Sequence, residues 1–135
     1  MPFEIIWEPH GAYKRLYGFV TASEFKQSIE KLHNDLHFDS LKYTINDFLG
    51  VHGHEIAKTD IAMFAALWIG ASFSNPNIRI ATITTDEKIM ELMQSYISSQ
   101  LKPSHLGIFS NVADARNWIK REIPQVLVPQ KHKIR

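Results

Sequence analysis

The sequence predicts an α/β fold: a mixed, mostly parallel sheet of about five strands with helices packed against it. Strand-like and helix-like runs alternate in the order β-β-α-β-α-β-α-β-α, and strands separated by helices pair in parallel through right-handed crossovers. A chain of 135 residues is long enough for one hydrophobic core but not for two. We therefore expect a single domain over residues 1–123 and a C-terminal tail over residues 124–135.

The centre of the predicted domain is the stretch Leu41–Phe73, which has the pattern of a strand, a polar loop and a helix. The strand contains the β-forming residues of Tyr43–Phe48, and the loop is expected over His52–Lys58. Thr59 is expected to be the N-cap of the helix, with Asp60 in the first turn, where a carboxylate suits the helix dipole.

Before this stretch, two β-like runs, Phe3–Glu8 and Tyr13–Val20, flank a Pro-His-Gly turn signal and predict an antiparallel hairpin. Thr21 and Glu24 then have the spacing of a capping box, in which each residue accepts a hydrogen bond from the backbone of the other. This spacing predicts that a helix begins directly after the second strand.

After the central stretch, the residues Ile78–Thr84 have the pattern of another strand. Thr84 and Glu87 then repeat the capping-box spacing before a helix that contains two methionines. A last short strand is expected over His105–Phe109. The Ser-Asn pair that follows it provides the cap of a final helix.

The composition argues against several functional classes. Fifteen basic and fourteen acidic residues create no field that selects nucleic acid, and the basic end with Lys131, Lys133 and Arg135 is expected to be a solvated terminus. The absence of cysteine excludes disulfides, thiolate metal sites and a cysteine nucleophile. Because the N-terminus has no signal-peptide pattern and the uncharged run 61–78 is too short for a bilayer, we expect a cytoplasmic protein without stable membrane insertion.

Five short segments of the chain match segments of a known family and occur in the same order. They are Gly18–Phe25, Tyr43–Phe48, Asp60-Ile61, Asn75–Ala81 and Phe109–Ile119. Together they resemble the SpoIIAA-like group of small bacterial proteins in the STAS superfamily, named for sulfate transporters and anti-sigma-factor antagonists. The resemblance spans roughly residues 3–120. It implies a STAS fold and a non-catalytic protein-interaction module, with regulation as one role of such modules.

One departure from the STAS regulators concerns the start of the apolar helix. Regulators that act as phosphorylation switches carry Asp-Ser-x-Gly there, and the serine accepts the phosphate. This chain has Ala57-Lys58-Thr59-Asp60-Ile61, so Thr59 lies near the acceptor position, but the glycine is missing and Asp60 would repel a phosphate. Thr59 and Asp60 therefore form either a regulatory position or, as the pattern favours, a plain helix start.

A second polar group is expected at the carboxyl edge of the sheet, formed by Asp47, His52 and His54. The spacing of the two histidines matches no established metal motif. Asp47 is expected to accept amide hydrogens from the loop that follows it. Since the chain also lacks a Walker loop and a G-x-S-x-G motif, we expect no catalytic residue, no metal and no cofactor.

The apolar helix carries the functional hypothesis, because no charged residue lies between Ile61 and Phe73. A helix on the outside of a sheet normally shows water a polar stripe. We therefore expect a surface covered by a partner or a ligand, formed by Met63, Phe64, Leu67, Trp68 and Met93.

Two functions fit such a surface. One is an interaction module that forms a homodimer or binds another protein. The alternative is a binder of a lipophilic small molecule in a pocket beside the helix 60–73, as implied by a resemblance in fold to the CRAL-TRIO lipid-transfer domains.

Overall fold

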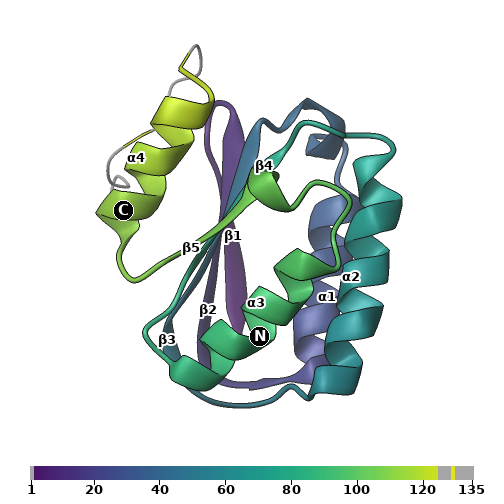
Figure 1. Cartoon of the computed structure of the whole chain (residues 1–135), viewed down its shortest axis with the longest axis vertical. Coiled ribbons are helices and arrows are strands. Elements are labelled where there is room, and N and C mark those ends of the chain that lie inside the picture. The colour runs from purple at the N-terminus through teal and green to yellow at the C-terminus, as the bar shows by residue number, and fades with distance from the viewer. Residues whose placement is uncertain (1, 125–128, 130–135) are drawn as a thin grey trace.

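A five-stranded sheet in the order β1-β2-β3-β4-β5 forms the centre of the computed structural model, which describes residues 2–124 and 129 (Figure 1). The strands are β1 (Phe3–Trp7), β2 (Gly11–Thr21), β3 (Tyr43–Glu55), β4 (Arg79–Ile83) and β5 (Leu106–Phe109). The helices are α1 (Ala22–His33), α2 (Lys58–Ser72), α3 (Glu87–Ser98) and α4 (Val112–Glu122). Strand β1 pairs antiparallel with β2 and all other neighbours pair in parallel, which confirms the expected mixed sheet. Most of the expected tail, residues 125–128 and 130–135, lies outside the described residues.

The helices cover the two faces of the sheet unequally. Helices α1, α2 and α3 lie on one face and α4 lies alone on the other (Figure 1). The larger core lies beneath the three helices, and a smaller core beneath α4 contains Tyr13, Tyr43, Ile45, Ala81, Ile83, Ala115 and Ile119. The middle strands are therefore buried on both faces, as is usual for parallel sheets.

Two of the expected helix starts are confirmed. The Thr21 hydroxyl accepts a hydrogen bond from the Glu24 amide at 3.1 Å, and the Glu24 carboxylate accepts one from the Thr21 amide at 3.0 Å. At the start of α4, the Asn111 side chain accepts a hydrogen bond from the Asp114 amide at 2.8 Å. Both caps satisfy amide groups that the first turn of a helix leaves without partners.

Strand β3 is longer than the sequence predicts, and this corrects the expected loop over His52–Lys58. The strand continues to Glu55 because β2 runs beside it and pairs with it up to Thr21. The pairing absorbs two irregularities, one of them next to Gly18, whose φ of 69° is a conformation that side chains disfavour.

The longer strand also moves the start of α2, so that Ala57 and not Thr59 is the N-cap. Asp60 is the third helical residue, and its carboxylate accepts a hydrogen bond from the Ala57 amide at 2.8 Å. Helix α3 is corrected in the same way, because Asp86 and not Thr84 caps it. The Thr84 hydroxyl instead accepts a hydrogen bond from the Asp86 amide at 3.1 Å.

Two long basic side chains are buried, one on each face of the sheet. Beneath α1, the Lys14 ammonium donates a hydrogen bond to the Ser28 hydroxyl at 3.0 Å. Beneath α4, the Arg116 guanidinium donates to both carboxylate oxygens of Glu8, at 3.0 and 2.8 Å. The Tyr43 hydroxyl donates to the same carboxylate. A pair that joins residues 108 positions apart thus holds α4 on the sheet.

Candidate functional site

The side of α2 that faces away from the sheet is exposed and, beyond Lys58 in the first turn, carries no charge. We call it the α2 outer face, and it consists of Ala62, Met63, Ala66, Gly70 and, one residue past the helix, Phe73. Met63 is 38% exposed and Phe73 is 79% exposed. None of the helices in the described part of the chain is both long and apolar enough to span a bilayer.

The structure separates the residues that the sequence assigned to a partner surface. Met63 lies on the α2 outer face and Leu67 is half-buried beside it. Phe64 is 0% exposed, because it points into the larger core, where its ring meets the ring of Phe25 from α1 edge-on with centroids 4.9 Å apart. Met93 is also buried in the larger core. Phe64 and Met93 are therefore core residues, which corrects their expected place at a surface.

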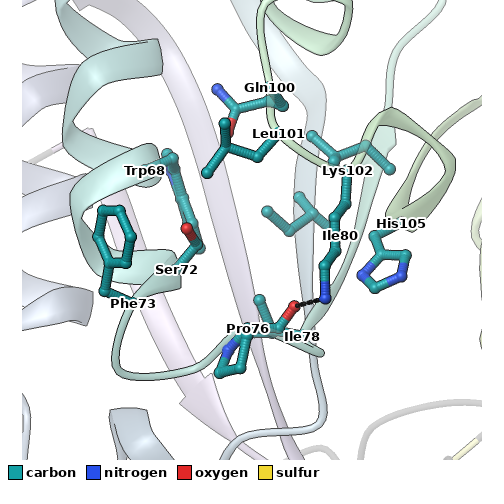
Figure 2. A pocket seen from close by; sticks show the side chains of 11 residues that line it. Trp68, Ser72, Phe73, Pro76, Ile78, Ile80, Gln100, Leu101, Lys102 and His105 are labelled. Atoms are coloured by element: carbon teal, nitrogen blue, oxygen red, sulfur yellow. Dashed lines mark hydrogen bonds between the residues drawn. The ribbon is translucent and has the colours of Figure 1, made fainter.

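Trp68 is buried from bulk solvent but lines a cavity of about 180 Å³ between the ends of α2 and α3 (Figure 2). The cavity opens beside the 3₁₀ turn Pro103–His105 and is backed by β4 and β5. Its lining consists of Trp68, Ser72, Phe73, Pro76, Ile78, Ile80, Gln100, Leu101, Lys102, His105 and Leu106. This cavity lies beside the apolar helix 60–73, and whether a lipophilic molecule binds there, as the alternative function expects, stays a prediction.

The two basic side chains of the cavity, Lys102 and His105, lie on the same side of it. Figure 2 shows Trp68 and Phe73 on one wall, with Lys102 and His105 across from them. The Lys102 ammonium donates a hydrogen bond to the Pro76 carbonyl oxygen at 3.3 Å. The buried Nδ1 atom of His105 has no hydrogen-bond partner among the described residues. Burial and the positive charges of Arg79 and Lys102 lower the pKa of His105.

The residues of the expected regulatory position lie together at the first turn of α2. Thr59 is exposed at the second helical position, and Asp60 follows it with its carboxylate bonded to the Ala57 amide. A phosphate on Thr59 would lie next to this carboxylate, which opposes the favourable field of the helix N-terminus.

The expected polar cluster of Asp47, His52 and His54 is divided. Asp47 is buried within β3, where the Tyr13 hydroxyl donates to one carboxylate oxygen and the Leu49 amide to the other. His54 lies nearer the end of β3 and accepts a hydrogen bond from the Ile56 amide at 3.2 Å. His52 is exposed. Among the described residues, no three or more histidine and carboxylate side chains converge on a point where a metal ion could bind.

Comparison with known proteins identifies the fold. No family model matches the chain. No curated protein matches it either. The solved structure of the anti-sigma factor antagonist SpoIIAA in its unphosphorylated form is similar, with a TM-score of 0.57 and 11% sequence identity over 92% of this chain and 99% of that chain. The Bacillus cell fate determinant SpoIIAA in its phosphorylated form has a TM-score of 0.56 and 12% identity over 87% of this chain and 98% of that one.

At these identities the similarity concerns the fold and not the site. The chain therefore has a SpoIIAA-like STAS fold, as the resemblance in sequence implied.

Proposed function

We propose that this chain is a non-catalytic, STAS-like protein-interaction module that works through the α2 outer face. The partner that we assign to this face is a second copy of the chain. The observation that carries the proposal is that a helix of fifteen residues has a solvent-facing side without any charged residue beyond its first turn.

The proposal is supported by the cost of leaving this face in water. Full burial of a large apolar side chain stabilises a protein by about 1.5–3 kcal/mol, and Met63 and Phe73 forgo part of this in the monomer. Between them lie only Ala66 and Gly70 on the outer face, so another helix can approach α2 closely. Contiguous apolar surface of this kind is typical of interaction sites.

A second copy is the simplest partner, because a two-fold axis needs only one self-complementary surface. Beyond the first turn of α2, where Lys58 is exposed, this face is apolar and can be complementary to itself, since that part carries no like charges that would repel each other across the axis. We assign Thr59 no role as a phosphorylation switch of this contact, because the carboxylate of the adjacent Asp60 would repel a phosphate there.

The test is the mass of the protein in solution for variants that place a carboxylate on the α2 outer face. Met63→Glu and Phe73→Glu are expected to raise the dissociation constant of the dimer at least about tenfold, because each buries a charge in an apolar contact. The matched control is Phe19→Glu, on β2, where the phenylalanine is 53% exposed and lies outside the α2 outer face. Sedimentation equilibrium measures the association, and circular dichroism shows that each variant is folded.

A concentration-dependent dimer in the native chain and in Phe19→Glu, but not in the two α2 variants, supports the proposal. A native chain that stays monomeric at the highest attainable concentration contradicts it. So does a dimer that all three variants retain, because the contact would then lie elsewhere.

A further inference from the structure

We propose that the cavity between the ends of α2 and α3 is a binding site for a small carboxylate whose apolar body is about the size of one ring. This site shares only Phe73 with the α2 outer face, and the inference is argued from the cavity and not from self-association. It narrows the lipophilic ligand that the sequence suggested to a class defined by size and charge.

The size of the ligand follows from the volume and lining of the cavity. The volume is about 180 Å³. An apolar cavity of about 150 Å³ is known to hold a benzene molecule, so this one accommodates a single ring with a short substituent. The deep part is lined by Trp68, Ile78 and Ile80, which offer an aromatic surface and branched apolar side chains. A ring placed there would exchange water for apolar contacts on several sides.

The charge of the ligand follows from Lys102 and His105. The Lys102 ammonium takes part in no ion pair with a carboxylate among the described residues, and it donates a hydrogen bond to the backbone carbonyl of Pro76. The Nδ1 atom of His105 is buried and lacks a partner among those residues. Arg79 adds positive charge near His105 but is itself paired with Glu122 at 3.5 Å.

A carboxylate matches these two groups better than a neutral ligand does. One of its oxygens can accept a charge-assisted hydrogen bond from the Lys102 ammonium, and the other can accept from His105 when Nδ1 carries the proton. A purely apolar molecule would form no hydrogen bond with His105 and no charge-assisted hydrogen bond with the Lys102 ammonium. The positive surroundings of the imidazole also oppose binding of a cation.

The experiment uses phenylacetate as the probe and its neutral analogue phenylacetamide as the matched ligand. The chain has three tryptophans, and only Trp68 lines the cavity. Its indole N–H signal in a two-dimensional NMR spectrum is assigned by elimination with Trp7→Phe and Trp118→Phe. We expect phenylacetate to move the Trp68 signal saturably while the other two indole signals stay in place. A ligand of roughly ten non-hydrogen atoms is expected to bind with a dissociation constant of about 1 mM or below.

Two variants locate the site. Ser72→Leu fills the cavity and is expected to abolish the shift of the Trp68 signal. The control is Ser98→Leu. The hydroxyls of Ser98 and Ser72 each donate a hydrogen bond to the backbone carbonyl three residues earlier in the chain. Ser98, however, is exposed and does not line the cavity. Lys102→Gln, at an exposed position that tolerates the change, is expected to weaken phenylacetate binding about two- to fivefold and to leave phenylacetamide binding unchanged.

The inference is supported if phenylacetate binds several times more tightly than phenylacetamide and the variants behave as described. Equal binding of the two ligands refutes the charge assignment. The site itself is refuted if no saturable shift of Trp68 occurs, or if Ser72→Leu binds as well as Ser98→Leu. If Ser72→Leu does not fold, an unchanged phenylacetate affinity in Lys102→Gln still overturns the proposal.

Discussion

We expect the stability of the native chain to rise with pH above neutrality, and we expect the Lys14→Met variant to lack this rise. Lys14 is 1% exposed, with its ammonium 3.0 Å from the Ser28 hydroxyl and 5.0 Å from the centre of the Phe25 ring. No carboxylate of the described residues forms an ion pair with it. Burial therefore lowers the pKa of Lys14 from 10.5 to about 7.

The sign and size of the effect follow from proton linkage. Between about pH 7 and pH 10.5, the unfolded chain keeps a proton on Lys14 that the folded chain has released. The free energy of unfolding therefore rises with pH, by about 2 kcal/mol between pH 7 and pH 9 for this one group. The destabilisation is fully present below about pH 7 and disappears above the pKa of the unfolded chain.

Methionine has a similar length and no charge, so Lys14→Met should be more stable than the native chain at pH 7 and lack this contribution to the slope. The Ser28 hydroxyl keeps its hydrogen bond to the Phe25 carbonyl, at 2.7 Å, and is not left without a partner. His33, whose pKa is lowered to about 4 by burial and by the Lys14 charge, titrates below this range.

The measurement is urea unfolding at several pH values between 7 and 9. The control is Lys120→Met, at an exposed position on α4, which is expected to keep the rise of the native chain. A native chain whose stability is flat over this range, or a Lys14→Met variant with the same rise, would show that Lys14 stays protonated in the folded state.

Two further predictions concern a helix start and a buried ion pair, and both are measured as urea unfolding free energies. Thr59→Ala is expected to change stability by less than about 0.5 kcal/mol, because Thr59 is an exposed residue inside α2. Asp60→Ala should cost about 0.5–1 kcal/mol, because its carboxylate accepts the Ala57 amide, and the opposite ranking would restore Thr59 as the cap. Arg116→Met is expected to cost about 3–5 kcal/mol, because the buried Glu8 carboxylate loses its guanidinium, and a loss below about 1 kcal/mol would contradict this role.

The order and type of the elements could be predicted from the sequence because their signals are local. The capping box of Thr21 and Glu24 acts over three residues, and the hairpin turn lies between two adjacent strands. The alternation of strands and helices then restricts the sheet to mostly parallel pairing. The apolar character of α2, and hence the hypothesis of a covered surface, is also a local property of the sequence.

The tertiary structure decided the features that depend on distant partners. Ala57 replaces Thr59 as the cap because β2 extends the pairing of β3 to Glu55. Lys14, in a basic pair that the sequence places on a hairpin, is buried because α1 covers its face of β2. The α2 residues that face the core rather than the outer face, and the cavity beside them, follow from how α2 and α3 pack on the sheet. A short-range pattern specifies which backbone forms, but burial depends on which elements meet, and those contacts join residues far apart in the chain.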